Sequence, residues 1–369
     1  MDVSFVEQLG TKLSTTVREY DAAADVEGIL VLAADEAGAA DTSALDTVAQ
    51  EISTPVFGGL FPGILYAGER YTEGAVVAAL PVEPTTTVVT GLSDPDRNIR
   101  PQLSANVVAP GETTAFVFVD GYASRIGTFV QRLFESYGVE CRFLGGGAGS
   151  LTAEDTACVV TGEGILADAA VLATLPLGCS LGVRHGWQDV DGPFRVNEAD
   201  GTRLSMLADG SAFDVYRRVV EADSGTQLTR ANFFEKAKSY PFGLSRLHEE
   251  KIVRDPFKVD DDGSITCFGD VPEGEFLHVL SGNPDSLVDA ARKATGDAIA
   301  TGGEGPLTVF DCISRVLYLE DRFDEELAAI GGPADPTLGA LTIGEVANGD
   351  GGHLEFYNKA TVVARIEDQ

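Results

Sequence analysis

The densest group of residues able to do chemistry lies near the C-terminus. The segment FDCISR brings Asp311, Cys312 and Arg315 to the point where a strand-like run meets a helix-like run. Glu345 follows a glycine in TIGEV, and Asn358 precedes the last strand-like run in FYNKA. Ligands often bind at strand ends of α/β sheets, so Arg315 could hold a carboxylate and Glu345 could accept an ammonium group. The alternative is an internal Arg–Glu ion pair with Cys312 in the core.

A second candidate is His185, which lies in RHGW beside a glycine and the only tryptophan of the chain. A lone histidine is often a hydrogen-bonded structural residue, and the alternative is contact with a ligand or ligation of haem iron. The other histidines, His248, His278 and His353, are far from it in sequence and show no paired spacing. A metal site built from several histidines is therefore not expected.

Three consecutive glycines, Gly145, Gly146 and Gly147, follow an apolar run in FLGGGAGS. Ser150 stands where the third glycine of a dinucleotide-binding fingerprint belongs, and the segment lacks the Gly-Lys-Ser/Thr ending of a P-loop. The segments VFGGLFPG and TIGEVANG occupy comparable places elsewhere in the chain. Such repetition favours a tight turn of the fold, where strands or a small ligand approach bare backbone, over a phosphate site.

Two further segments resemble functional motifs in their residue types, but the residues around them do not support the function. GCSLG around Ser180 matches the nucleophile elbow of hydrolases, but the following VRHGWQDV favours a strand where the elbow needs a helix. VDDDGS lacks the glycine and glutamate positions of a calcium-binding loop, so a hairpin turn is expected there.

Composition narrows the class of protein. The chain has 369 residues, 44% of them hydrophobic, and a formal net charge of −32. Scattered acidic residues are typical of a halophile-like surface, and the alternative is an acidic face that binds a partner. The lack of a basic stripe disfavours nucleic acid binding. Five widely spaced cysteines indicate a reduced, cytoplasmic protein. Neither a secretion signal nor a membrane span is expected.

The elements that must position these residues come in three copies of one unit. Each copy runs strand, amphipathic helix, glycine-ended strand, strand, and the strand spacing suits a βαβ unit. The copies extend from GILVLAADE to GAVVAALP, from TAFVFVD to DAAVLATLPLG, and from PLTVFDC to ATVVARI. We therefore predict an α/β (α+β layered) fold, with mixed sheets built from repeated strand-helix-strand-strand units in two tightly packed halves.

The region between the second and third copies has a different pattern. Hairpin turns are predicted at residues 200–201 and 262–263, and helices are predicted to begin at Ser211 and Asn283. No linker marks the boundary between the halves. The predicted parts are an N-terminal helix at 1–25, an N-terminal domain at 26–205 and a C-terminal domain at 206–369.

The order of these segments from Val26 to Ile366 resembles the FIST family, an intracellular ligand-sensing module with an N-terminal and a C-terminal domain. The matching pieces include VFGGLFPG, FLGGGAGS, GVRHGW, AFDVYRRV, YPFGLSR, IVRDPFKVDDDGSI, FDCISRVLYL, GALTIGEVANG and YNKATVVARI. The resemblance places recurrent polar positions of the family at His185, Tyr240, Arg254, Asp255, Cys312, Arg315, Glu345 and Asn358.

This resemblance implies a sensory protein that binds a small ligand such as an amino acid. Family members are often joined to kinase, cyclase or chemoreceptor modules, and some are linked to haem and nitric oxide sensing. The sequence ends at Gln369 without such a module, so a separate signalling partner, such as a kinase or chemoreceptor component, is expected. The family supplies no agreed catalytic mechanism, so no residue inherits a catalytic role.

We therefore expect a pocket between the halves that binds an amino acid or similar small zwitterion. The predicted ligand contacts are Gly145, Gly146, Gly147, His185, Arg254, Cys312, Arg315, Glu345 and Asn358. The alternatives are a haem-dependent nitric oxide sensor that uses His185, an enzyme that uses Cys312 or His185 with Glu345, and a scaffold whose acidic surface docks a partner.

Overall fold

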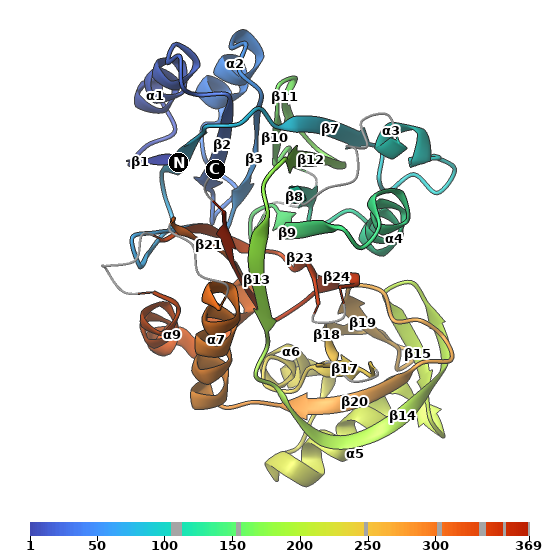
Figure 1. Cartoon of the computed structure of the whole chain (residues 1–369). Coiled ribbons are helices and arrows are strands. Elements are labelled where there is room, and N and C mark those ends of the chain that lie inside the picture. Colours follow the sequence, from blue (N-terminus) through green and yellow to red (C-terminus); the bar gives the residue numbers. More distant parts are fainter. Residues whose placement is uncertain are drawn as a thin grey trace.

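Sheets and the helices packed on them build the whole molecule (Figure 1). The computed structural model describes residues 1–104, 113–152, 156–246, 250–300, 305–331, 337–349 and 352–367. The strands within these ranges form four sheets, three of six strands and one of seven. This mixed α/β architecture confirms the predicted fold class.

Three copies of one βαβ unit form the centre of the molecule, as the sequence predicts. In each copy, the first strand pairs in parallel with the second and, on its other side, antiparallel with a later strand. The first copy comprises β2 (Gly28–Ala34), α2 (Ser43–Glu51), β3 (Val56–Phe61) and β6 (Ala75–Leu80). The second comprises β8 (Thr113–Asp120), α4 (Ile126–Tyr137), β9 (Cys141–Ala148) and β12 (Ala169–Leu175). The third comprises β21 (Leu307–Cys312), α8 (Ile313–Leu319), α9 (Phe323–Ile330), β22 (Thr337–Thr342) and β25 (Thr361–Ile366).

A glycine occupies the same place in the second strand of each copy. Gly58, Gly145 and Gly339 lie opposite a valine of the neighbouring parallel strand, at Val31, Val117 and Val309 respectively. A Cβ atom at any of these glycines would collide with the carbonyl oxygen of the opposite valine. The repeated glycine therefore lets parallel strands approach each other. In the third copy this position belongs to Gly339, and not to Gly344 of the TIGEVANG segment that we expected.

The two halves of the chain exchange strands. The hairpin β4 (Gly63–Tyr66) and β5 (Glu69–Tyr71) of the first half pairs with β22 of the third copy. The hairpin β23 (Glu345–Asn348) and β24 (Leu354–Tyr357) of the second half extends the sheet of the second copy at β9. The strand β13 (Cys179–Arg184), which contains Ser180 as predicted, borders β25. This exchange packs the halves tightly together.

Aromatic side chains from all three copies meet in the core. The ring centroids of Phe57 and Phe116 are 5.7 Å apart, and those of Phe118 and Phe310 are 5.5 Å apart. All four side chains are buried. Because Phe57 lies on β3, Phe116 and Phe118 on β8, and Phe310 on β21, this cluster holds the three units against one another.

The fourth sheet is antiparallel and lies with two helices at one end of the molecule (Figure 1). Its strands are β14 (Gln188–Asp200), β15 (Arg203–Leu207), β16 (Gly210–Ser211), β17 (Phe242–Leu244), β18 (Ile252–Val259), β19 (Ile265–Phe268) and β20 (Phe276–Ser281). These two helices are α5 (Ala212–Ser224) and α6 (Phe233–Ala237), and helix α7 (Pro284–Ile299) lies nearer β25. Both predicted hairpin turns are present. Ser211 and Asn283 cap α5 and α7 as predicted, since each side chain accepts a hydrogen bond from a first-turn backbone N–H group.

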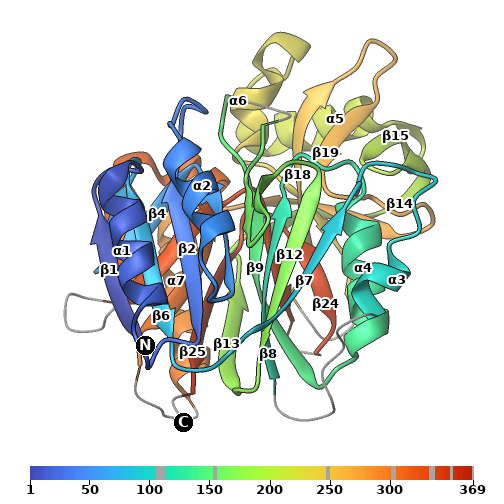
Figure 2. The ribbon, with the colours of Figure 1, turned by 90° about the horizontal axis from the view of Figure 1, so that it is seen from above.

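The N-terminal segment contains a strand as well as the predicted helix. Strand β1 (Asp2–Val6) pairs with β6 and precedes helix α1 (Thr11–Asp21), which packs beside α2 (Figure 2). The remaining elements of the described residues are β7 (Thr85–Thr90), α3 (Arg100–Ser104), β10 (Val159–Thr161), β11 (Gly164–Leu166) and the short 3-10 helices η1 (Arg230–Asn232) and η2 (Glu320–Arg322). Among the helices described, none combines the length and the apolar character needed to span a bilayer.

Candidate functional site

The glycine run of β9 meets another part of the backbone. The N–H group of Gly147 donates a hydrogen bond of 2.8 Å to the carbonyl oxygen of Gly344, and the N–H group of Ile343 donates one of 2.9 Å to that of Gly147. A Cβ atom at Gly146 would lie 2.5 Å from the Gly344 oxygen. Protein backbone therefore occupies the space beside Gly146 and Gly147. The space beside Gly145 is occupied by the neighbouring strand β8. These glycines join the sheets of two repeats.

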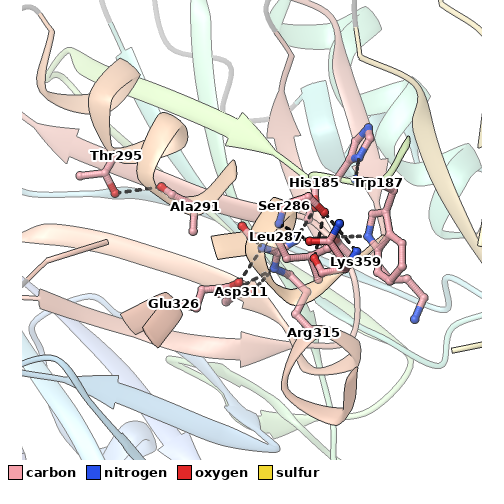
Figure 3. Close-up of polar contacts among 12 residues, drawn as sticks. His185, Trp187, Ser286, Leu287, Ala291, Thr295, Asp311, Arg315, Glu326 and Lys359 are labelled. Carbon is pink, nitrogen blue, oxygen red and sulfur yellow. Dashed lines mark hydrogen bonds and ion pairs between the residues drawn. The ribbon is translucent and has the colours of Figure 1, made fainter. Parts of the chain in front are cut away.

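Arg315 forms the centre of a buried ionic cluster (Figure 3). Its Nε and Nη2 atoms donate hydrogen bonds of 2.8 Å to the two oxygens of Glu326, and Asp311 Oδ1 lies 3.3 Å from Nε. Burial and the nearby Glu326 carboxylate raise the pKa of Asp311 well above its usual range, although Arg315 opposes this. Arg315 and Glu326 thus form the internal Arg–Glu ion pair that the sequence offered as the alternative to a ligand site.

The remaining guanidinium donors of Arg315 bind backbone carbonyl groups. Nη1 donates to His185 at 2.7 Å and to Lys359 at 3.1 Å, and Nη2 donates to Leu287 at 3.0 Å. A guanidinium group has five N–H donors, so all of them are engaged by the protein itself. The geometry leaves Arg315 no donor for a ligand carboxylate. Its role here is to tie α8, α9 and the chain segments around His185 and Lys359 together.

Arg254 is also committed to the protein interior. Its Nε atom donates to the Asp270 carbonyl at 2.7 Å, and Nη1 donates to the carbonyls of Val253 and Phe356 at 3.0 and 2.8 Å. The side chain is buried, and burial lowers the pKa of its guanidinium group. Arg254 therefore connects β18 to β24 across the interface between sheets.

His185 is buried directly after β13, and it does not line the cavity that contains Cys312 and Asn358 described below. Its Nδ1 atom accepts a hydrogen bond of 2.9 Å from the Trp187 N–H group, and Nε2 lies 3.6 Å from Glu250 Oε2. Burial, followed by the charge of Arg315, lowers the pKa of His185 to about 3, so the ring is neutral. The cavity that it lines has a volume of about 20 Å³. This space suits one water molecule and is far too small for a porphyrin.

A larger cavity lies where the carboxyl ends of β21 and β22 meet the fourth sheet. Its volume is about 190 Å³. Tyr122 and Leu151 of the first half line one side, and residues of the second half line the rest. The polar lining residues are Lys238, Asp255, Cys312, Ser314, Asn358 and Lys359, and the other lining residues are Phe234, Pro256, Phe257, Phe268, Ile313, Leu317, Ile343 and Gly344.

An ion pair lies on the wall of this cavity. Lys359 Nζ is 3.1 Å from Asp255 Oδ2, and the Ser314 hydroxyl donates to the same oxygen at 2.9 Å. The Lys359 side chain is 1% exposed, and its Nζ atom also donates to the Lys238 carbonyl at 3.2 Å. Trp187 Nε1 donates to the Lys359 carbonyl at 3.2 Å, so the lysine backbone is held firmly in place.

Asn358, one of the residues that line the cavity, has a side-chain acceptor without a described partner. Asn358 is 3% exposed, and no described residue donates a hydrogen bond to its Oδ1 atom. Nearly all buried polar atoms in proteins have a partner, because an unpaired one costs free energy. Asn358 is therefore a candidate contact for a ligand N–H or O–H group in the cavity.

Cys312, which lines the cavity, forms a buried pair with Glu345, which does not. Glu345 Oε1 accepts a hydrogen bond of 2.8 Å from Thr342 Oγ1, and Oε2 accepts one of 3.3 Å from the Ala360 N–H group. Burial raises the pKa of Glu345 to about 8, although these hydrogen bonds and one with Cys312 oppose the rise. Burial also raises the pKa of the Cys312 thiol. The cysteine is therefore a thiol at neutral pH, which does not favour a nucleophile.

The structure separates the predicted site residues into two groups. Cys312 and Asn358 line the 190 Å³ cavity, and Glu345 contacts Cys312. The three glycines, His185, Arg254 and Arg315 hold strands and loops together. Sequence reasoning missed Ser314 and Lys359. One available signal was the lysine in FYNKA, immediately before the buried strand ATVVARI in a chain with 26 basic residues.

Across the described ranges, no cluster of three or more His, Cys, Asp or Glu side chains could hold a metal ion. His278 and His353 lie apart from the cavity, and His248 lies outside the described residues.

Comparison with known protein families gives two matches in sequence order. Residues 28–209 match the model described as the FIST N domain, and residues 212–348 match the FIST C domain. Together the matches cover most of the chain. No curated protein matches it.

Proposed function

Because the chain belongs to the FIST family, whose domains are associated with small-ligand binding in sensory signal transduction, we propose that it binds a small molecule in the 190 Å³ cavity. The observation that carries this proposal is that Asn358, whose buried Oδ1 atom has no donor among the described residues, is one of the residues that line this cavity. A cavity that adjoins an unsatisfied polar atom, an ion pair and apolar side chains has the composition of a ligand site.

The finer part of the proposal is that the ligand is an amino acid or a similar small zwitterion. Asp255 and Lys359 offer one charge of each sign, and Asn358 offers an acceptor for an ammonium group. An ammonium group would approach Asp255 and Asn358, and a carboxylate would approach Lys359. The volume is somewhat above the roughly 150 Å³ of a cavity known to hold benzene, so an apolar side chain would fit against Phe257 and Leu317.

Isothermal titration of the full chain with single amino acids, starting with aromatic and aliphatic ones, tests this proposal. Asn358→Leu, which removes the unsatisfied amide but keeps its approximate volume, is expected to weaken binding at least about tenfold. Asn98→Leu, at an exposed position, is the matched control and should bind as the original chain does. The proposal fails if no amino acid binds, or if Asn358→Leu binds with unchanged affinity.

A catalytic role for Cys312 with Glu345 is the second candidate, and one observation favours it, namely the contact between the thiol and the carboxyl group. The raised pKa of Cys312 weighs against it, because a nucleophilic cysteine needs a thiolate. For the haem alternative, the space beside His185 does not accommodate the cofactor.

We also propose that the protein works in the cytoplasm and passes its signal to a separate partner, such as a kinase or a chemoreceptor component. The five unpaired cysteines support a reducing compartment. Ligand contact with Tyr122 and Leu151 on one side and Asp255 on the other would alter how the halves pack. A partner that reads this packing should bind the ligand-loaded and ligand-free forms with different affinities, which co-purification with and without the amino acid would measure.

A further inference from the structure

A second cavity of about 290 Å³ adjoins the first one. Tyr122, Phe257 and Phe268 line both cavities, and the ring centroids of Phe257 and Phe268 are 4.5 Å apart. The second cavity also reaches Phe356 and Asp270. Aromatic side chains are therefore prominent in its lining.

The two cavities occupy corresponding places in two of the repeats. The first lies where β21 passes into α8, at Cys312 and Ile313, and the second lies where β8 passes into α4, between Gly121 and Ile126. Ligands in α/β proteins commonly bind at the carboxyl ends of strands. The second cavity has this position with respect to β8.

The charge of the second cavity comes from one side chain. Of the described residues that line it, only Asp270 is charged. No described residue forms a hydrogen bond or an ion pair with its carboxylate. The Nε atom of the nearby Arg254 is directed to the Asp270 carbonyl oxygen. Burial raises the pKa of Asp270, opposed by the charges of Arg254 and Arg125. Within the described ranges this carboxylate therefore has no hydrogen bond or ion pair of its own, and Arg254 and Arg125 act on it only through their charge.

We propose that the second cavity binds a small organic cation, with an alkylated ammonium group against the aromatic rings and Asp270 as its counter-ion. The face of an aromatic ring carries negative electrostatic potential, and a cage of such rings attracts quaternary ammonium groups. Alkali metal ions and divalent cations instead require several oxygen ligands. This proposal is independent of the amino acid proposed for the first cavity.

Gly127 in the first turn of α4 provides the space that the Asp270 carboxylate occupies. A Cβ atom at Gly127 would collide with Asp270 Oδ2. Alanine is favoured over glycine inside helices, so Gly127→Ala should preserve α4 while displacing the carboxylate. The change therefore perturbs the cation site without removing any charge.

Titration calorimetry of the full chain with choline chloride and with tetramethylammonium chloride, against potassium chloride at equal ionic strength, tests the proposal. Saturable binding of both organic cations and none of potassium is expected. Asp270→Asn should weaken choline binding at least about tenfold, because it removes the counter-ion, and Gly127→Ala should also weaken it. The exposed Asp289→Asn is the matched control and should bind choline as the original chain does.

Three results would overturn the proposal: no saturable binding of either organic cation, an equal response to potassium, or unchanged choline affinity in Asp270→Asn. Misfolding of this variant would be recognised from thermal unfolding without choline. Its melting temperature should equal or exceed that of the original chain, because the substitution removes a partly buried charge that no described residue holds in an ion pair. Retained amino acid binding in Asp270→Asn would show that the first cavity is intact.

Discussion

The raised pKa of Glu345 makes the stability of the fold depend on pH. The carboxyl group is buried, and its pKa rises from 4.5 to about 8 on folding, chiefly through burial. The folded protein therefore retains a proton that the unfolded chain loses above its ordinary pKa. The stability linked to this proton is fully present below about pH 4.5 and is lost progressively as the pH rises through about 8.

We predict that Glu345→Gln reduces this pH dependence. At about 1.4 kcal/mol per pKa unit, the rise from 4.5 to about 8 corresponds to an upper bound of roughly 5 kcal/mol between the two limits. Glutamine keeps an acceptor for the Thr342 hydroxyl and cannot ionise. Relative to the original chain, the variant should therefore gain stability on going from pH 5 to pH 9.

Urea unfolding at several pH values between 5 and 9 measures this effect. The quantity to compare is the difference in the free energy of unfolding between Glu345→Gln and the original chain at each pH. Glu273→Gln, at an exposed position, is the matched control and should show a nearly constant difference. A constant difference for Glu345→Gln as well would refute the reasoning, because it would mean that this carboxyl group titrates alike in both states.

Two further predictions concern the frame of the site. Arg315→Met should destabilise the fold by about 3–5 kcal/mol, because it leaves the buried carboxyl groups of Asp311 and Glu326 without their counter-ion. Urea unfolding measures this loss of stability, and a loss below about 1 kcal/mol would contradict the prediction. Gly339→Ala should lower the free energy of unfolding by about 1–3 kcal/mol, since the added Cβ atom would collide with the neighbouring strand. Gly162→Ala is the control, because the space around Gly162 is open. Thermal unfolding should give a lower melting temperature for Gly339→Ala than for Gly162→Ala, and equal melting temperatures would contradict the prediction.

The local elements could be predicted from the sequence because each has a strong local signal. The helix α4 shows buried Ile126, Phe129, Val130 and Leu133 at the helical period, and the caps of α5 and α7 follow from single residues. The repeated unit was recognisable because its strands are continuously apolar. These signals reside within a few neighbouring residues, so one sequence suffices to find them.

The tertiary partners of the polar residues could not be predicted in the same way. Arg315 pairs with Glu326 on the following helix, whereas the sequence pattern had directed attention to Glu345. Asp255 and Lys359 are far apart in the chain and meet only because β18 and the loop before β25 converge. Which acidic residue pairs with which basic residue depends on how the sheets pack. Because acidic residues are in excess, many pairings are equally compatible with the sequence.

The strand exchange between the halves bears on how the molecule could be divided. The family matches separate between residues 209 and 212, yet β4 and β5 complete a sheet of the second half, and β23 and β24 complete one of the first. A fragment cut at this point would expose sheet edges that are normally paired, and exposed edges promote aggregation. Two such fragments supplied together would each bring the missing hairpin of the other. We therefore expect the FIST N and FIST C segments to depend on each other for folding, and reassembly from two pieces would rebuild the proposed ligand cavity at the same time.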